Sequence, residues 1–482
     1  MILASAALAV AAFLVGFHLT GIIPTASRIV ALARSAGSVM ADRNLADEDK
    51  EKAIQKAALA MLGAAFSIFL RVAVTLLITV LPVYLLSWAG LAPAGEVFAF
   101  LARIDVIVGA TVIVMGGLWL WSKRPKPDPE AAGQYSRMDR AVHRLAFAAP
   151  FVQATAADVE DALFAKDIEG IEQKPPVFIT SLPRAGTTVV LNALHQVPGV
   201  ATHLYRDMPF VMAPLLWSRL SSGFHRESEL AERAHGDGIE VGYDSPEAFE
   251  EMIWRHFWPG NYHEDRIDLW AGDDKDGEAT EFFKRHFRKI VALRSGPGGR
   301  YVSKNNGNMA RLPLLGEMFP AAAIILPLRD PAEHAASLLR QHVNFIGQHA
   351  SDPFIGRYMR DIGHYEFGSL HRPIAFDGLA GLVGGLTPDQ PDYWLGYWLA
   401  AMDHAASRPD TIQVLPETVL QDNPQAVMRA LCERLELDPG STDFAAGIRA
   451  VAPRADRAAF DADLLARAED RYRDLAAKCT LL

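Results

Sequence analysis

The sequence is poor in cysteine, with only Cys432 and Cys479 among its 482 residues. This excludes a disulfide framework and a cysteine-based zinc site, and it suits a domain that faces the reducing cytosol. Positive charge is not in excess either, because 47 Lys and Arg residues stand against 57 Asp and Glu residues. A net charge of −10 argues against a nucleic-acid-binding protein, although a local basic pocket for a small anion remains compatible with it. No set of carboxylates or histidines has metal-ligand spacing, so we expect no metal.

Long apolar runs dominate residues 1–124. We expect three membrane-spanning helices there, at about residues 2–23, 72–91 and 97–121, because a run of roughly 20 apolar residues can cross a bilayer. The third is the weakest, since two charged residues lie near its start. No Lys or Arg precedes the first run, which is unlike a cleaved signal peptide.

The positions of the basic residues predict the orientation. The connection between the first two runs is rich in Lys and Arg, and the segment after the third begins with Lys123, Arg124 and Lys126. Such segments tend to stay on the cytoplasmic side. We therefore expect a multi-pass protein of the inner, cytoplasmic membrane. Residues 125–173 are predicted to form a linker and a lead-in helix, and residues 174–482 a catalytic domain that faces the cytoplasm.

A strand, a loop and a helix are predicted around residue 180. Residues 177–180 read Val-Phe-Ile-Thr, which is typical of a buried strand, and residues 189–196 favour a helix. The loop between them reads Ser-Leu-Pro-Arg-Ala-Gly-Thr-Thr over residues 181–188. Backbone N–H groups in such a loop and at the start of the helix bind phosphate. The alternative is a plain strand-to-helix turn with a threonine cap.

The side chains of this loop suit an anion. Gly186 lets the backbone approach closely, Thr187 and Thr188 offer hydroxyl groups, and Arg184 brings a positive charge. The loop differs from that of the nucleotide triphosphatases, which ends in Gly-Lys-Ser/Thr. Here the basic residue precedes the glycine.

A second strand-like run, residues 322–328, leads into Arg329 and a predicted helix that carries Ser337. Ligands of open α/β sheets bind beyond the carboxyl ends of the strands. Arg329 and Ser337 are therefore placed to hold a phosphate by charge and by a hydroxyl group. The alternative is an exposed arginine beside a helix-capping Asp330.

Taken together, the two motifs resemble the sulfotransferases that use 3′-phosphoadenosine 5′-phosphosulfate (PAPS). The resemblance covers roughly residues 175–437 and implies an α/β fold, a P-loop-like parallel sheet flanked by helices. PAPS is then the co-substrate and adenosine 3′,5′-bisphosphate the product. The resemblance assigns the 5′-phosphosulfate to Arg184, Ala185, Gly186, Thr187 and Thr188, and the 3′-phosphate to Arg329 and Ser337. The family's closing strand and helix are matched less well, because Pro416 stands where a tyrosine is usual.

Transfer to a neutral hydroxyl also requires cationic groups around the leaving phosphate and a proton acceptor. By resemblance, Lys304 at the end of the strand-like run 301–304 is a site lysine, with a surface lysine as the alternative. In family members the proton acceptor often follows the loop helix. Here Asp207 is the first choice and His203 the second, and an ion pair between Asp207 and Arg206 is the alternative.

The sequence thus predicts a membrane-anchored sulfotransferase that acts on a hydroxyl or amine. Its acceptor is a small molecule or, given three predicted spans, a lipid or other membrane-borne molecule. Two alternatives stay open. A small-molecule kinase would depend on ATP and Mg²⁺, and a non-catalytic membrane scaffold would bind the nucleotide without turnover.

Overall fold

The structure is a computed structural model. The chain divides into two compact units, Met1–Glu130 and Ala131–Leu482. The residues that the structure describes are 2, 5–6, 8–10, 12–13, 47–90, 93–103, 106, 137–147, 150–172, 174–221, 231–232, 240–241, 245–247, 249–407, 412–449 and 452–481.

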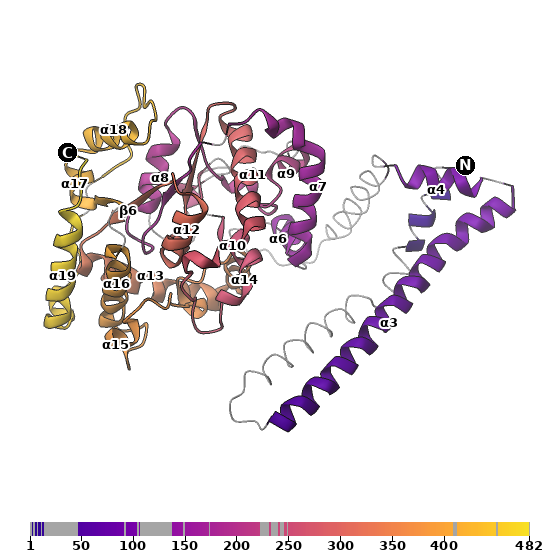
Figure 1. Ribbon diagram of the computed structural model, residues 1–482, viewed down its shortest axis with the longest axis horizontal. Helices are drawn as coiled ribbons and strands as arrows, with labels where there is room; N and C mark the ends of the chain where they lie inside the picture. The colour runs from indigo at the N-terminus through magenta and orange to yellow at the C-terminus, as the bar shows by residue number, and fades with distance from the viewer. Residues whose placement is uncertain are drawn as a thin grey trace. The chain divides into compact units, whose positions relative to one another are not determined.

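The described part of the first unit is helical. Helix α3 runs from Asp47 to Trp88 with Pro82 inside it, and the short helix α4 spans Ala94–Leu101 (Figure 1). Within α3, the segment Ser67–Trp88 has 22 residues and a mean hydropathy of 2.3, and little of it is buried. By length and composition it can cross a membrane, and it is the one such helix among the described residues.

This helix differs from the predicted span 72–91 at both ends. It is continuous on the N-terminal side, so the apolar residues 57–70 belong to the same helix. It ends at Trp88, because the following turn contains Gly90 with a left-handed backbone (φ 71°).

Three membrane-spanning helices are not observed in the described part of the chain. The predicted span 97–121 does not begin as one helix, since α4 ends at Leu101. There the N–H group of Arg103 bonds to the carbonyl of Phe100, a short-range pairing typical of a helix end. The rest of that span and most of the predicted span 2–23 lie outside the described residues.

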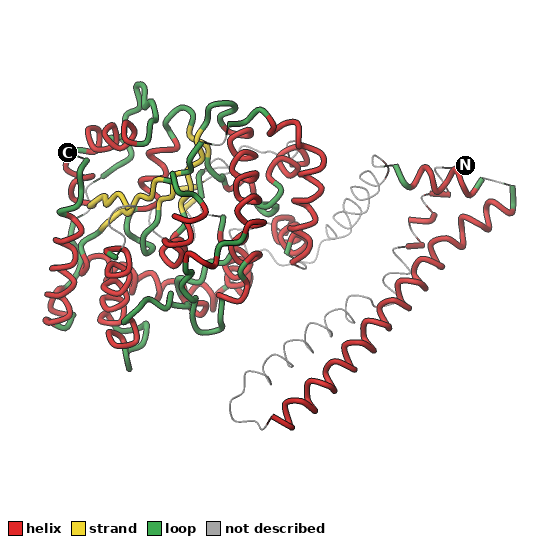
Figure 2. Tube along the Cα trace, viewed as in Figure 1, coloured by secondary structure: helices red, strands yellow, loops and turns green. Residues whose placement is uncertain are grey.

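The second unit contains a parallel sheet of five strands in the order β2-β5-β1-β6-β7 (Figure 2). This confirms the predicted parallel sheet flanked by helices. A separate antiparallel pair joins β3 (Ala231–Glu232) to β4 (Glu240–Val241). The strands of the main sheet are β1 (Val177–Ile179), β2 (Val200–Ala201), β5 (Arg300–Lys304), β6 (Ala323–Leu328) and β7 (Ile412–Pro416).

Helices cover both faces of the sheet (Figure 1). The helices that the structure describes in the second unit are α6 (Arg137–Ala146), α7 (Pro150–Glu169), α8 (Thr187–His195), α9 (Pro214–Ser221), α10 (Glu251–Phe257), α11 (Gly277–Arg294), α12 (Leu312–Met318), α13 (Pro331–Ser351), α14 (Pro353–Ile362), α15 (Leu379–Val383), α16 (Pro391–Ala406), α17 (Glu417–Asp422), α18 (Pro424–Arg434) and α19 (Ala462–Ala476). Short 3₁₀ turns lie at Tyr205–Asp207, Pro259–Asn261, Gly272–Asp274, Asn306–Arg311, Gly368–Leu370 and Arg457–Ala459.

The central strand β1 is apolar throughout because both of its faces are covered. Alternate residues of a strand point to opposite faces. Phe178 belongs to the larger core cluster, to which α11, α12, α13 and α16 contribute. Val177 and Ile179 belong to a second cluster, which residues of α8 and α18 complete.

The lead-in helices α6 and α7 lie on the second unit. Arg140 of α6 pairs with Asp352 at 2.8 Å, and His143 Nε2 lies 2.9 Å from Asp361 Oδ2. Glu160 of α7 pairs with Lys289 of α11 at 3.0 Å, and both side chains are buried. The described part of the predicted linker, from Arg137 onward, is therefore part of the second unit.

A buried ion pair stabilises the segment that follows β5. The Arg311 guanidinium stacks on the rings of Trp254 and Trp270, and its Nη2 lies 2.7 Å from both carboxylate oxygens of Glu251. Asn305 Nδ2 also donates to Glu251 Oε2 at 2.8 Å. Burial opposes the ionisation of Glu251, but these partners outweigh it and keep its pKa below the usual value.

Replacing Arg311 with Met should destabilise the fold by about 3–5 kcal/mol, because the Glu251 carboxylate would stay buried without its counter-ion. Thermal unfolding followed by tryptophan fluorescence measures the loss, since Trp254 and Trp270 contact the guanidinium. Arg467→Met, on the exposed side of α19, is the control and should stay within about 0.5 kcal/mol of the native chain. Equal stability of the two variants would contradict this account.

Candidate active site

The loop between β1 and α8 contains two residues with a positive φ, Arg184 (74°) and Gly186 (93°). A left-handed backbone is uncommon for a non-glycine residue and often marks a functional site. Gly186 is the N-cap of α8, so no side chain from the cap position covers the first N–H groups of the helix. This differs from a plain turn with a threonine cap. The free N–H groups at the start of α8 can bind an anion.

The second motif lies against this loop. Strand β6 pairs with β1, and Thr180 N donates to Ile325 O at 2.9 Å where β1 passes into the loop. Beyond the end of β6, Arg329 Nη1 donates to the Arg184 carbonyl oxygen at 3.2 Å. From α13, Ser337 Oγ lies 3.4 Å from Arg184 Nε. The structure therefore brings together two motifs that are 145 residues apart in the chain.

Several arginines gather around Ser337. Arg340 lies one helical turn further along α13, and its pKa is lowered by burial and by the nearby charges of Arg329, Arg454 and Arg184. Arg329 is balanced in part by Glu417, whose Oε2 lies 3.2 Å from Arg329 Nε. Like charges held together repel, so an anion among these guanidinium groups would relieve the repulsion.

His334 supports the loop from α13. Its Nε2 lies 2.8 Å from the Pro183 carbonyl oxygen, and Trp398 Nε1 donates to its Nδ1 at 3.1 Å. The two bonds require a neutral imidazole that carries its proton on Nε2. Burial, together with the charges of Arg329 and Arg184, lowers the pKa of His334 to about 3.

Lys304 lies at the carboxyl end of β5, opposite Ile179 of β1. It is buried rather than a surface lysine, and its Nζ donates to Glu247 Oε1 at 3.1 Å. The hydroxyl of Tyr205 donates to the other oxygen of Glu247 at 2.8 Å. Lys304 therefore pairs with Glu247 at the same edge of the sheet at which the loop between β1 and α8 begins.

Asp207 has several partners in a buried position. Its carboxylate accepts from Leu204 N at 2.9 Å, lies 3.2 Å from His203 Nδ1, and pairs with Arg294 of α11. Burial raises its pKa, but the bond from His203 and the charge of Arg294 outweigh this and hold the pKa below its usual value. The ion partner is thus Arg294 and not the neighbouring Arg206. The catalytic roles predicted for Asp207 and His203 stay predictions.

His203 contacts one oxygen of this carboxylate, Oδ2, whereas Arg294 contacts the other, Oδ1. Its Nε2 is 3.0 Å from His286 Nε2, and the two rings are stacked. Burial and the neighbouring charges of His203 and Lys289 hold the pKa of His286 well below its usual value. The two histidines and Asp207 thus form a buried chain of polar contacts.

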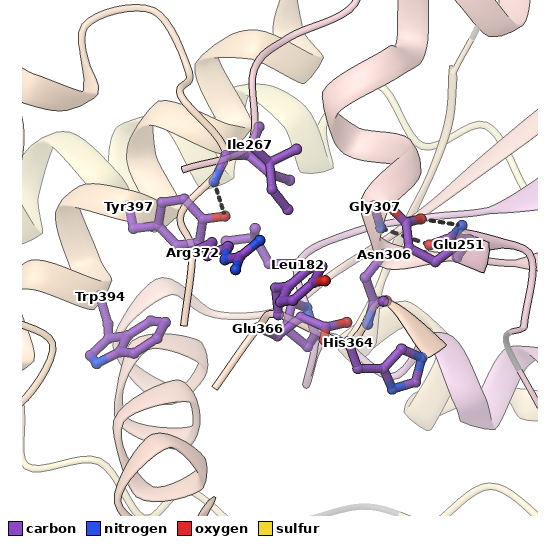
Figure 3. A pocket seen from close by; sticks show the side chains of 15 residues that line it. Leu182, Glu251, Ile267, Asn306, Gly307, His364, Glu366, Arg372, Trp394 and Tyr397 are labelled. Atoms are coloured by element: carbon purple, nitrogen blue, oxygen red, sulfur yellow. Dashed lines mark hydrogen bonds between the residues drawn. The ribbon is translucent and has the colours of Figure 1, made fainter. Parts of the chain in front are cut away.

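A pocket opens beside the loop (Figure 3). Figure 3 shows Glu366 and Arg372 between the aromatic side chains of α16 and the turn that follows β5. Asn306 of that turn connects the pocket to the loop, since its Oδ1 lies 3.4 Å from Thr187 Oγ1. The lining residues are Leu182, Pro183, Glu251, Ile267, Asn305, Asn306, Gly307, Gly363, His364, Tyr365, Glu366, Arg372, Ile374, Trp394 and Tyr397.

Sequence reasoning missed several of these residues. His334 lies within the second motif, five positions after Arg329, and could have been noticed as a buried histidine on the predicted helix. Glu247, Glu366 and Arg372 belong to no motif and reach the site only through the tertiary fold. Among the described residues, no group of His, Cys, Asp or Glu is placed to hold a metal ion.

Residues 175–372 match a family model described as "Sulfotransferase family". This part of the chain is a sulfotransferase-family domain. The matched range includes both motifs that the sequence predicts to bind anions, and it also includes Lys304, Glu366 and Arg372. Helix α16, which lines the pocket, lies beyond the matched range.

No curated protein matches the chain. The solved structures that match include crystal structures of the sulfotransferases STF9 from Mycobacterium avium and STF1 from Mycobacterium tuberculosis. STF9 is 15% identical with a TM-score of 0.37, over 72% of this chain and 79% of that chain. STF1 is 12% identical with a TM-score of 0.39, over 72% and 89%. The sulfotransferase domain of the Synechococcus PCC 7002 olefin synthase is 14% identical with a TM-score of 0.28, over 64% and 96%.

His334 makes the folding stability of the domain depend on pH. Its folded pKa lies below the unfolded value of about 6.5, so the stability it contributes is complete above pH 6.5 and is lost as the pH falls toward 3. Below about pH 6.5, the free energy of unfolding falls by about 1.4 kcal/mol for each pH unit because of this residue. His334→Gln keeps a donor for Pro183 and an acceptor for Trp398 but does not titrate. Thermal unfolding between pH 6 and pH 4 should show a shallower pH dependence for this variant, and an unchanged slope would contradict the assignment.

Proposed function

We propose that the chain is a PAPS-dependent sulfotransferase that transfers a sulfuryl group to a hydroxyl or an amine. The observation that carries the proposal is the contact between the two anion-binding turns, in which Arg329 and Ser337 lie against Arg184. A nucleotide with phosphate groups at both ends suits two such turns. The sulfotransferase-family domain over residues 175–372 supports the same reaction class.

The residues of the two turns fit the two ends of PAPS. At one end, the N–H groups at the start of α8, the hydroxyls of Thr187 and Thr188, and the Arg184 charge suit the 5′-phosphosulfate. At the other end, Arg329 and Ser337 suit the 3′-phosphate. The mutual repulsion of the arginines around Ser337 supports an anion site there.

PAPS supplies the activated sulfuryl group. The chain's own residues position it and stabilise the charge that grows on the leaving phosphate. Lys304 can donate to a phosphate oxygen while it keeps its bond to Glu247, because an ammonium group has three N–H donors. Ala185 and Gly186 provide backbone close to the same phosphate.

The kinase alternative has no specific feature of the described residues in its favour. The cation of the loop is Arg184, which precedes Gly186, whereas the loop of a nucleotide triphosphatase places a lysine after its last glycine. The scaffold alternative differs from the proposal only in turnover, so a transfer assay decides between them.

We also propose that the acceptor is membrane-borne, such as a lipid, and that the catalytic domain faces the cytoplasm at the inner membrane. The apolar segment Ser67–Trp88 supports a membrane anchor. The basic connection between the first two apolar runs and the basic segment after the third support the orientation. PAPS is made in the cytosol, so a domain on that side has access to it.

Arg329→Met should weaken the binding of adenosine 3′,5′-bisphosphate about 10- to 100-fold, since a hydrogen bond to a charged group contributes about 1.5–3 kcal/mol. Ser337→Ala should weaken it about tenfold or less. Binding of AMP, which lacks the 3′-phosphate, should change little in either variant. Isothermal titration on the full chain in detergent measures all three.

The matched control is Arg357→Met on α14, where the arginine is 47% exposed and lies outside the cluster. It should bind both nucleotides as the native chain does. If Arg329→Met lost affinity for AMP and for the bisphosphate equally, the assignment of Arg329 to the 3′-phosphate would be incorrect.

The transfer itself is tested with ³⁵S-labelled PAPS and membranes that contain the full chain. Inverted inner-membrane vesicles should transfer label to a lipid fraction, because the catalytic domain is then exposed to the donor. Sealed vesicles of the native orientation should transfer little. Nucleotide binding without any labelled product would support the scaffold alternative, and labelling in the native orientation alone would reverse the proposed topology.

A further inference from the structure

The pocket beside the loop has the position of an acceptor site. Its lining includes Leu182 and Pro183 from the loop, and Asn306, which contacts Thr187. A molecule in the pocket therefore lies next to the group that the loop would hold. This inference rests on the proposed function, because a sulfuryl group at the loop defines the reacting end of the pocket.

Two carboxylates line the pocket, and one of them is fully engaged. Glu251 accepts bonds from Arg311, Tyr262 and Asn305. Glu366 differs, because in the part of the chain that the structure describes its carboxylate makes no hydrogen bond or ion pair. It is close enough to Tyr397, across the pocket, for its charge to affect that hydroxyl.

The backbone around Glu366 is held firmly although its carboxylate is not. The Glu366 carbonyl oxygen lies 2.6 Å from His371 Nδ1, and His371 Nε2 lies 2.8 Å from the Tyr393 hydroxyl on α16. Tyr397 Oη accepts from Ile374 N at 3.1 Å and fixes the other end of the same segment. A carboxylate on an anchored backbone, directed into a pocket, is well placed to accept a proton.

Arg372 is the cation of the pocket. Its guanidinium lies over the Tyr365 ring, 4.1 Å from the ring centre, and its backbone N–H donates to the Tyr365 carbonyl at 2.8 Å. It forms no ion pair with any residue that the structure describes. A positioned guanidinium without a carboxylate partner suits an anionic group on a ligand.

We propose that this pocket binds the acceptor, that Glu366 takes the proton of the acceptor hydroxyl, and that Arg372 holds an anionic group of the same acceptor. The acceptor is then a hydroxyl compound with an acidic group and an apolar part. The apolar part lies against Trp394, Tyr397 and Ile374. Such chemistry is found both in acidic lipids and in soluble hydroxy acids.

The acceptor oxygen forms a bond to sulfur, and the bond between sulfur and the bridging oxygen of the 5′-phosphate breaks. The electron pair of that bond stays on the phosphate, which leaves as part of adenosine 3′,5′-bisphosphate. The hydroxyl proton passes to the Glu366 carboxylate.

Glu366→Gln removes the proton acceptor without a change in size. Transfer of ³⁵S from labelled PAPS to the hydroxyl acceptor in membranes should fall about 10²- to 10⁴-fold. Affinity for adenosine 3′,5′-bisphosphate should stay within twofold of the native chain. Glu433→Gln, on the exposed face of α18, is the matched control and should transfer normally.

4-Nitrophenol separates a proton acceptor from a structural residue, because this phenol is largely ionised at pH 8 and needs no base. Glu366→Gln should lose less than tenfold with it. An equal loss with both acceptors would indicate a structural role and overturn the assignment. His364→Gln is the competing variant, since His364 also lines the pocket. A greater loss there than in Glu366→Gln would transfer the role to His364.

Arg372→Gln tests the acceptor class. It should raise the KM for the membrane acceptor about tenfold or more and leave kcat within threefold. Once the sulfate has been removed by solvolysis, the acceptor should still bind an anion-exchange resin. A neutral acceptor would overturn the role of Arg372. Extraction of the label into the organic phase identifies a lipid, and retention in the aqueous phase identifies a soluble hydroxy acid.

These outcomes are distinct from a failure of the proposed function. If the native chain neither bound adenosine 3′,5′-bisphosphate nor transferred label, the proposed function would fail and this inference with it. If the native chain did both and Glu366→Gln and Arg372→Gln behaved like Glu433→Gln, only the present inference would fail.

Discussion

The parallel pairing of β1 with β6 is the constraint on which the site depends. Because the two strands run in the same direction and in register at Ile179 and Ile325, the segments that follow them leave the same edge of the sheet side by side. The loop that contains Arg184 and the start of α13 therefore meet. Neither segment alone has the groups to hold both ends of a doubly phosphorylated nucleotide. A shift in this register would separate them.

The loop that contains Arg184 and the arginines near it adopt an arrangement that is unfavourable in free energy by itself. The rest of the domain keeps this arrangement in place. Arg184 has a left-handed backbone, and the positive charges of Arg329, Arg454 and Arg184 all lower the pKa of Arg340. Such strain and repulsion persist only where the surrounding structure fixes them, and they cluster at functional sites. His334 supplies part of that support, because its neutral imidazole joins the loop to α16. An anionic ligand would supply the remaining compensation.

The sequence predicted the parts of the fold that local patterns determine. The apolar run of β1, the glycine-containing loop and α8 follow one another in the chain, so their order alone indicated an anion site. Arg294 and Glu247 could not be predicted in this way, because they reach Asp207 and Lys304 from elements distant in sequence. Glu366 and Arg372 belong to no sequence motif, and they too reach the site only through the tertiary fold. The helix end at Leu101, inside the predicted span 97–121, could not be predicted because hydropathy does not register it, and most of that span lies outside the described residues.

A structure of the full chain with adenosine 3′,5′-bisphosphate bound is the most direct test of the account. It should place the 3′-phosphate within hydrogen-bond distance of Arg329 and Ser337, and the 5′-phosphate at the N–H groups of Gly186 and Thr187. A nucleotide that contacted only one of the two turns, or that bound with neither phosphate at these residues, would contradict the account.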